Sequence, residues 1–370
     1  MHPAALRLAI VSDAQPERNG VGTYYRDLCE HLRPVLGRVA FMAPGAGEPA
    51  VRCWLRMPLP GDGTQRVELP SPLALRRRLR DLRPHAVVAA TPGPYGLLGA
   101  RCARRMGARL VVGLHTDFEA LSALYWGTVF GRLNRWGMAS VHRRLFRGAD
   151  CVVANSPGMR GLARRNGVAA AELMGTQLPR EFLDMPVEPL GERLERVLFV
   201  GRLAAEKRVH RVLEAAAQRP GLCFGIAGDG PLRADVEAAA ARRPNLRYLG
   251  WQSRAGIRRA LDGADLLVLP SEVEAFGTVA LEALARGRTA LVSPGCGISG
   301  WPELARGLYE MRPGEGLAEA IDRLAALDPA ERRSSAARGR AAVHAMSAAT
   351  RAQWLEVLGA AGDGQLPEAV

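Results

Sequence analysis

Short apolar runs alternate with amphipathic segments along the whole chain. In the first half, we expect a strand wherever a few apolar residues stand together. The expected strands are 6–11, 38–43, 86–90, 109–114 and 151–154. Between them, apolar positions recur every three or four residues, which is typical of a helix with one buried face. The expected helices are 21–36, 72–82, 95–106, 131–147 and 158–166.

The second half repeats this alternation. Its expected strands are 197–200, 222–227, 246–249, 266–269 and 289–292. Its expected helices are 208–218, 231–242, 254–262, 277–287 and 316–327. Strands that alternate with helices are joined by right-handed crossovers and form parallel sheets. The pattern therefore predicts an α/β protein in which each half is a doubly wound, Rossmann-like domain.

The length of 370 residues also favours two domains, since it exceeds what one hydrophobic core usually organises. A proline-rich stretch over 176–195 is typical of a linker. We therefore expect a first domain over 1–175 and a second over 196–346. Two such domains bind their ligand near the carboxyl ends of their sheets.

Composition excludes several classes of protein. With 48% hydrophobic and 24% charged residues, the chain is typical of a soluble globular protein. No apolar run approaches the roughly 18 residues that a membrane span needs, and the run 6–11 is too short for a signal peptide. The six cysteines are scattered without C-x-x-C spacing, which argues against a zinc site or a disulfide framework and favours a cytoplasmic location.

The net charge of +13 is unevenly distributed. Residues 1–186 carry 26 arginines against 14 acidic residues, whereas residues 187–370 carry 24 basic against 23 acidic residues. This asymmetry predicts that the first half faces a polyanion, either nucleic acid or an anionic membrane. A generally arginine-rich composition with no such partner is the alternative.

Lys207 is the only lysine beside 49 arginines. An ammonium is a compact point charge and a guanidinium is a planar fork, so the two do not exchange freely at a tight site. Arg202 follows the strand 197–200, and Lys207 stands at the start of the next helix. Both cations are placed to reach one diphosphate at the carboxyl end of the strand. A solvated surface pair is the alternative.

A small-residue segment follows the first strand. Gly20, Val21 and Gly22 open the helix after it, and exposed backbone N–H groups there suit a phosphate. The preceding Asn19 makes an Asn-Gly pair with Gly20, which is also a common turn.

Two further segments end in candidate polar groups. The segment 274–282 leads from a strand into a helix, and its candidates are Glu274, Phe276, Gly277, Thr278 and Glu282. Backbone N–H groups at the start of this helix can donate to a ligand. The carboxylate of Glu282 suits a vicinal diol such as ribose. A solvated glutamate on a helix face is the alternative for Glu282.

His115 and Asp117 follow the strand 109–114, with Tyr125 and Trp126 a few residues later. A single histidine is usually structural, but one at a strand's carboxyl end is better placed for a substrate.

These motifs resemble the retaining nucleotide-sugar glycosyltransferases of family 4, which have the GT-B fold. The G-R-L-x-x-E-K segment 201–207 and the E-x7-E segment 274–282 carry the resemblance, which covers essentially the whole chain. The segment 92–127 is similar to a branch with phosphatidylinositol-mannoside mannosyltransferases and sulfoquinovosyl-diacylglycerol synthases. The resemblance implies two Rossmann-like domains facing across a cleft, the first binding the acceptor and the second the nucleotide sugar. It also implies a terminal helix over 347–360 that crosses back to the first domain.

The resemblance further implies roles for individual residues. Arg202 and Lys207 would bind the diphosphate of a UDP- or GDP-sugar, helped by the backbone of Gly20–Gly22. Glu282 would hold the ribose. Glu274 and the backbone of Phe276, Gly277 and Thr278 would meet the transferred hexose and its phosphate. His115 would touch the donor sugar at the reacting face.

Three features depart from the family pattern. Arg208 stands where a glycine commonly follows the lysine, Arg286 and Arg288 replace a small residue and a proline, and the loop 294–298 replaces a Gly-Gly loop. These departures concern the recognition of base and sugar more than the type of reaction.

The expected mechanism needs neither a metal nor a cofactor. Fixed cations stabilise the charge on the departing diphosphate, and the chain has no D-x-D motif of the kind that metal-dependent transferases use. Retention through a carboxylate nucleophile would need two carboxylates, and no second one is evident in the sequence. The family implies same-face attack by the acceptor hydroxyl, with the leaving phosphate taking its proton.

The acceptor is expected to be a lipid or to be presented by a membrane. Aromatic residues and arginines interleave over 118–147, and an arginine run occupies 76–80. This combination suits peripheral binding to an anionic membrane, here the inner face of the cytoplasmic membrane. Asp117, Tyr125 and Trp126 are the candidate acceptor contacts.

Other interpretations stay open. A helix pair that buries the aromatic rings is the alternative to membrane binding. A soluble or polysaccharide acceptor and a non-catalytic basic binding protein are the alternative functions. Nucleic acid is not an expected partner, because no nucleic-acid motif is present and the second half is nearly neutral.

Overall fold

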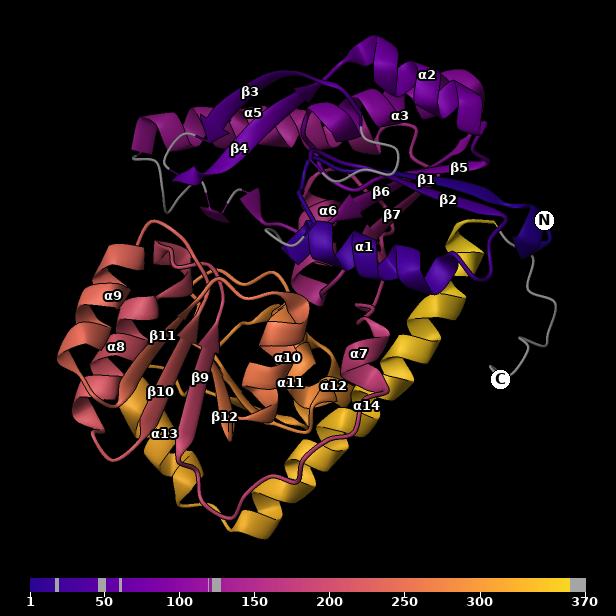
Figure 1. The fold of residues 1–370 in the computed structure, drawn as a ribbon. Helices are drawn as coiled ribbons and strands as arrows, with labels where there is room; N and C mark the ends of the chain where they lie inside the picture. The colour runs from indigo at the N-terminus through magenta and orange to yellow at the C-terminus, as the bar shows by residue number, and fades with distance from the viewer. Residues whose placement is uncertain (17–19, 46–50, 60–61, 119, 122–127, 360–370) are drawn as a thin grey trace. The chain divides into compact units, whose positions relative to one another are not determined.

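The computed structural model describes residues 1–16, 20–45, 51–59, 62–118, 120–121 and 128–359. The chain forms two compact units, each built on a six-stranded parallel sheet (Figure 1). The first unit comprises Met1–Leu59, Gln65–Pro179 and Ser347–Val370. The second comprises Pro60–Thr64 and Arg180–Met346. The two parallel sheets confirm the predicted pair of doubly wound α/β domains.

In the first unit, the strand order is β2-β1-β5-β6-β7-β8. Its strands are β1 Arg7–Val11, β2 Arg38–Met42, β5 Ala86–Ala89, β6 Arg109–Leu114, β7 Cys151–Ala154 and β8 Glu172–Leu173. Its helices are η1 Pro3–Ala5, α1 Gly20–Leu32, α2 Pro72–Leu82, α3 Pro94–Met106, α5 Thr128–Phe146 and α6 Pro157–Arg165. The central strands are buried on both faces, which explains their nearly continuous apolar sequences.

In the second unit, the strand order is β11-β10-β9-β12-β13-β14. Its strands are β9 Arg196–Val200, β10 Cys223–Ala227, β11 Leu246–Gly250, β12 Leu266–Leu269, β13 Thr289–Val292 and β14 Leu308–Glu310. Its helices are α7 Arg180–Leu183, η2 Ala205–Lys207, α8 Val209–Gln218, α9 Arg233–Arg242, α10 Arg254–Asp262, α11 Thr278–Ala285, η3 Gly297–Gly300, α12 Pro302–Ala305 and α13 Leu317–Ala325. The chain order reverses between β9 and β12, and such a switch point is where open α/β sheets bind ligands.

Several elements escaped the sequence prediction. The hairpin β3 Cys53–Leu59 and β4 Asp62–Pro70 was not expected, because exposed residues follow one another along β3 without the alternation that marks a half-buried strand. The expected linker 176–195 contains helix α7. The short edge strands β8 and β14 were also missed.

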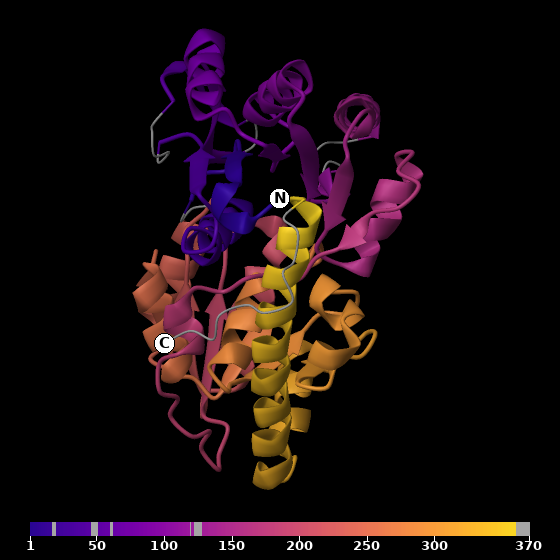
Figure 2. The same ribbon diagram turned by 90° about the vertical axis from the view of Figure 1, so that its right-hand side faces the viewer.

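The terminal helix is longer than expected. Helix α14 runs from Pro329 to Val357 as one helix, although only its last part, 347–360, was predicted. Its Ala- and Arg-rich start lacks a regular apolar stripe, so hydrophobic periodicity does not reveal it. The helix belongs to the second unit through Met346 and to the first from Ser347 (Figure 2). No helix among the described residues is long and apolar enough to cross a membrane.

An aromatic cluster joins this last helix to the core of the first unit. Trp354 is fully buried, and its Nε1 donates a hydrogen bond of 3.0 Å to the Tyr24 hydroxyl. The rings of Tyr25 and Trp354 meet edge to face. Tyr25 in turn shares a 2.7 Å hydrogen bond with Nε2 of His115. Gly113 makes room for this contact, since a Cβ there would lie 2.1 Å from the Tyr25 hydroxyl oxygen.

The imidazole of His115 is buried in this cluster at the carboxyl end of β6. Burial disfavours the charged form and lowers the pKa of His115 to about 3. The ring is therefore neutral at physiological pH.

Trp354→Ala is expected to lower the free energy of unfolding by about 3–5 kcal/mol, because it leaves a cavity in the core of the first unit. Urea denaturation measures the change. Trp136→Ala is the matched control, since Trp136 is 69% exposed and its truncation is expected to cost less than about 0.5 kcal/mol. Equal losses in the two variants would contradict the core role of Trp354.

His115 is expected to make stability depend on pH between about 6.5 and 3. Below about pH 6.5 the unfolded chain binds a proton at His115 and the folded chain does not, so stability is lost as pH falls, by up to about 1.4 kcal/mol per pH unit. Above about pH 6.5, His115 is neutral in both the folded and the unfolded chain and no longer makes stability depend on pH. Denaturation of the wild type and of His115→Gln from pH 7.5 to 4.5 checks this; parallel curves would show that His115 does not titrate as described.

Candidate active site

The switch point of the second sheet brings two of the predicted segments together. Arg202 and Lys207 follow β9, and Glu274 follows β12, its neighbour in the sheet. Because parallel strands end at the same edge, the loops after them converge. The backbone N–H of Glu272 donates to the carbonyl of Glu206 over 2.7 Å and ties the two loops directly.

Lys207 and Glu274 form an ion pair within this edge. The Lys207 Nζ lies 2.5 Å from Oε2 of Glu274, and the Ser271 hydroxyl lies 3.3 Å from the same oxygen. The side chains are only 21% and 13% exposed. Burial alone would lower the pKa of the Lys207 ammonium, but the carboxylate of Glu274 outweighs it and the pKa is raised. Lys207 is therefore a fixed cation, and a solvated surface position is excluded.

Arg202 is held by Glu206, a residue that the sequence analysis did not single out. Its Nη1 donates to Oε1 of Glu206 over 3.1 Å, and the Glu206 side chain is almost fully buried. A buried carboxylate beside a guanidinium restricts the directions in which the remaining N–H groups point. The i,i+4 spacing of Arg202 and Glu206 was the available signal in the sequence.

A glycine lets the loop after β10 support this segment. Gly228 has a φ of 141°, and a Cβ there would lie 1.8 Å from the carbonyl oxygen of Gly201. The backbone N–H of Leu203 donates to the carbonyl of Asp229 over 3.0 Å. Close backbone packing thus explains Gly228.

Gly277 opens helix α11 in a conformation that other residues adopt with strain. Its φ is 99°, and a Cβ would lie 3.0 Å from Sγ of Cys296. Phe276 is buried, and its carbonyl accepts a 2.7 Å hydrogen bond from the N–H of Ile298. The groups of the segment 276–278 that could contact a ligand are therefore backbone groups rather than the Phe276 ring. Thr278 begins helix α11, whose first N–H groups lack intrahelical partners.

The loop 294–298, one of the departures from the family pattern, packs closely against this segment. A Cβ on Gly297 would lie 1.9 Å from the carbonyl oxygen of Ala275. The loop thus supports the turn before α11.

Glu282 is not a solvated glutamate. Its side chain is 4% exposed and forms an ion pair with Arg254, from the start of α10. No sequence pattern points to Arg254, because its partner lies 28 residues away on another helix.

The other departures from the family pattern have structural explanations. Arg208 has a φ of 48°, in the left-handed region that glycine favours, and its guanidinium lies 2.8 Å from Glu272. Arg286 and Arg288 are fully buried. Arg286 binds Asp262 and the carbonyls of Phe182, Met185 and Pro186, and Arg288 binds the carbonyl of Glu188. These two arginines fix the segment 182–188 to the rest of the second unit.

Helix α1 carries one group of candidates in the first unit and packs against another, since its Tyr24 and Tyr25 lie beside His115. Gly20, Val21 and Gly22 begin α1, and a Cβ on Gly22 would lie 2.3 Å from the carbonyl oxygen of Gln15. His115 lies in the aromatic cluster. Asp117 accepts a 2.8 Å hydrogen bond from the N–H of Ala120. Tyr125, Trp126 and Asn19 lie outside the described residues.

Asp13, which the sequence did not single out, follows β1 in the first unit. Its carboxyl group accepts hydrogen bonds from the Thr91 hydroxyl at 2.6 Å and from the N–H groups of Tyr95 and Gly96 at 2.7 and 3.2 Å. Burial raises its pKa, against these hydrogen bonds. Asp13 thereby fixes the start of α3, a role that only the folded chain reveals.

Both halves of the chain match models of known protein families. The family described as Glycosyltransferase Family 4 matches residues 18–174, and the family described as Glycosyl transferases group 1 matches residues 182–340. The lipopolysaccharide core biosynthesis glycosyltransferase LpsE of Rhizobium meliloti is 30% identical over 53% of this chain, a match that spans 59% of LpsE. A GDP-mannose-dependent alpha-mannosyltransferase of Mycobacterium tuberculosis is 29% identical over 79% of this chain and 80% of its own.

Solved structures share the fold. The crystal structure of Anabaena HepE in complex with UDP and glucose superposes with a TM-score of 0.72 at 18% identity, over 96% of this chain and all of that one. Both halves of the chain thus match glycosyltransferase families, and the two parallel sheets match the GT-B architecture. The chain belongs to the family 4-type glycosyltransferases of the GT-B fold.

Proposed function

We propose that this protein transfers a hexose from a UDP- or GDP-sugar to an acceptor hydroxyl, with retention of the anomeric configuration. The observation that carries the proposal is the pairing of Lys207 with Glu274 at the switch point of the second sheet. Relatives named for GDP-mannose and a structural neighbour solved with UDP support a nucleoside diphosphate as the leaving group.

The charges suit a departing diphosphate. Arg202 and Lys207 are fixed cations, and the start of α11 offers backbone N–H groups and the positive end of a helix dipole. An ammonium has three N–H donors, so a Lys207 that donates to Glu274 has donors left for phosphate oxygens. Charges fixed before the reaction stabilise the transition state without reorganisation.

The remaining steps of the proposal are those that the family resemblance implies. The acceptor hydroxyl attacks on the face that the diphosphate leaves, and the leaving phosphate oxygen takes its proton. Glu274 meets the transferred sugar, and Glu282 holds the ribose. The contacts assigned to Gly20, Val21, Gly22 and His115 stay predictions of the family resemblance.

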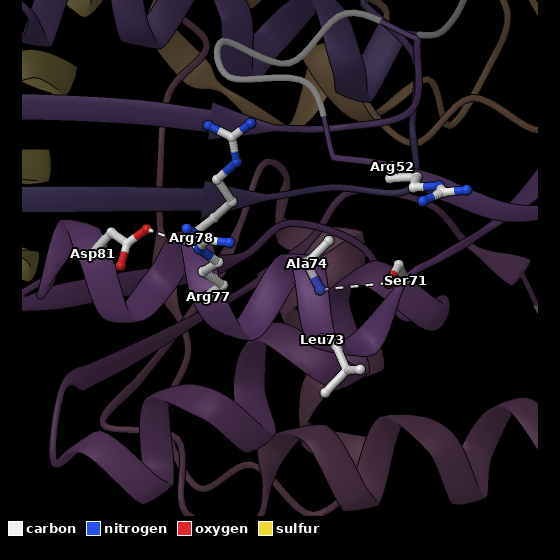
Figure 3. A pocket seen from close by; sticks show the side chains of 7 residues that line it. All are labelled: Arg52, Ser71, Leu73, Ala74, Arg77, Arg78 and Asp81. Carbon is white, nitrogen blue, oxygen red and sulfur yellow. Dashed lines mark hydrogen bonds and ion pairs between the residues drawn. The ribbon is translucent and has the colours of Figure 1, made fainter.

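We further propose that the acceptor is a lipid or is presented by an anionic membrane. A relative that acts in lipopolysaccharide core biosynthesis supports this. So does a hollow of about 590 Å³ in the first unit. Figure 3 shows its lining, which is rich in arginine: Arg52, Ser71, Leu73, Ala74, Arg77, Arg78 and Asp81.

Exposed apolar side chains line this hollow and a second one that shares Arg52 with it. Leu73 on α2 and Trp54 on β3 are each 76% exposed, and Leu55 and Met57 on β3 are also exposed. Trp, Leu and Arg on one surface suit the interface of an anionic bilayer, where rings and stems enter the headgroup layer and charges meet phosphate. On α5, where the sequence placed this contact, Trp136 is exposed, whereas Phe146 is half-buried and stacks on His142.

The donor assignment is tested by binding and transfer. Saturating UDP or GDP is expected to raise the unfolding temperature, since a ligand at about 100 times its Kd adds about 2.7 kcal/mol of stability. Lys207→Ala is expected to reduce the transfer rate by at least about a hundredfold and Lys207→Arg by less. Arg233→Ala, which removes an exposed cation of the same unit, is the control. Wild-type transfer by Lys207→Ala, or no stabilisation by either nucleotide, would refute the function.

The membrane assignment is tested by co-sedimentation with phosphatidylcholine vesicles that contain or lack phosphatidylglycerol. Binding is expected only to the anionic vesicles and to weaken in high salt. The double variant Arg77→Glu/Arg78→Glu is expected to bind at least about tenfold more weakly, because each arginine at the surface contributes about 1 kcal/mol. Arg164→Glu/Arg165→Glu, an exposed adjacent pair in the same unit, makes the same change of charge elsewhere. Equal losses in both double variants would argue against this surface.

A further inference from the structure

Arg254 pairs with Glu282, the predicted ribose ligand. It is the first residue of α10, after the N-cap Ser253, whose hydroxyl accepts a 3.2 Å hydrogen bond from the N–H of Gly256. Its Nη1 donates to Oε1 of Glu282. The two side chains are 13% and 4% exposed, so the pair is largely removed from water.

An aromatic ring also lies against this guanidinium. The Arg254 guanidinium carbon lies 4.6 Å from the centroid of the Phe182 ring. Phe182 is fully buried in α7, and its carbonyl accepts a 3.3 Å hydrogen bond from the buried Arg286. A cation that is both stacked on a ring and bonded to a carboxylate has little freedom to turn. Arg254 is thus fixed by packing that reaches back to the segment 182–188.

The contact with Arg254 determines how the Glu282 carboxylate is oriented. A carboxylate has two oxygens that each accept hydrogen bonds, and Arg254 takes one of them, Oε1. The bond fixes the plane of the carboxylate and so the direction of the second oxygen. It also supplies the opposite charge that a nearly buried carboxylate requires.

We propose that Arg254 is a positioning residue for binding of the donor's ribose. It holds the Glu282 carboxylate in the orientation that accepts hydrogen bonds from the two vicinal hydroxyls. The inference rests on the proposed function, since it takes Glu282 as the ribose ligand. Arg254 acts through Glu282 and has no direct part in the chemistry.

The test compares nucleoside diphosphates with and without the ribose hydroxyls. UDP and GDP and their 2′,3′-dideoxy forms are titrated calorimetrically into the wild type, Arg254→Gln, Glu282→Gln and Arg258→Gln. Arg258 is the matched control, because it lies on the same helix and pairs with Asp262 at 2.9 Å rather than with Glu282.

The wild type is expected to prefer the ribose form by about ten- to a hundredfold, as for hydrogen bonds to a charged group. In Arg254→Gln and Glu282→Gln this preference is expected to fall below about threefold, while the affinity for the dideoxy form hardly changes. Arg258→Gln is expected to keep the full preference. Arg254→Lys, which retains a charged donor, is expected to keep part of it and guards against a folding defect in the glutamine variant.

Four outcomes would overturn the proposal. Equal weakening of ribose and dideoxy forms in Arg254→Gln would mean that Arg254 serves the phosphate or the fold. An unchanged preference would mean that it does not orient Glu282. Tighter binding of the ribose form would mean that Arg254 competes with the ribose. A full preference retained by Glu282→Gln would remove the premise that Glu282 binds the ribose. A wild type that binds neither nucleotide would refute the proposed function itself.

Discussion

The second unit depends on pairing each partly buried cation with a carboxylate or a row of carbonyls. Removing a charge from water costs several kcal/mol unless an opposite charge or hydrogen bonds compensate it. At the edge of the second sheet, Lys207 is compensated by Glu274 and Arg202 by Glu206. These pairs hold the cations in fixed positions, and charges that are fixed in advance stabilise an anion with little reorganisation.

The same physical rule explains buried arginines that the proposed function does not use. Arg286 and Arg288 are fully buried and bind the carbonyls of the segment 182–188, and Arg332 binds the carbonyl of Glu192. A guanidinium carries five donors in a planar fork and can satisfy several carbonyls at once. An ammonium cannot reproduce that geometry. In a chain with one lysine, arginine thus serves as a scaffold, and the lysine is found where a compact charge meets Glu274.

The two parallel sheets and the helices that cover them were predictable from the sequence, whereas the peripheral elements were not. Buried parallel strands such as β1 and β12 are apolar on both faces and alternate with amphipathic helices, a pattern that survives in any tertiary context. The hairpin β3–β4 and the start of α14 lack such a pattern. Their form depends on neighbours that the local sequence does not specify.

For the candidate site, the sequence by itself determined the identities and the positions along the chain. Lys207 and Arg202 stand after one strand and Glu274 after another, and the parallel sheet alone implied that these loops converge. Only the tertiary structure decided the partners: Glu206 for Arg202, Arg254 and Phe182 around Glu282, and Tyr25 beside His115. The reason is physical. Local periodicity gives the succession of strands and helices along the chain. The partner of a desolvated charge is set by which distant side chains packing brings within hydrogen-bond distance.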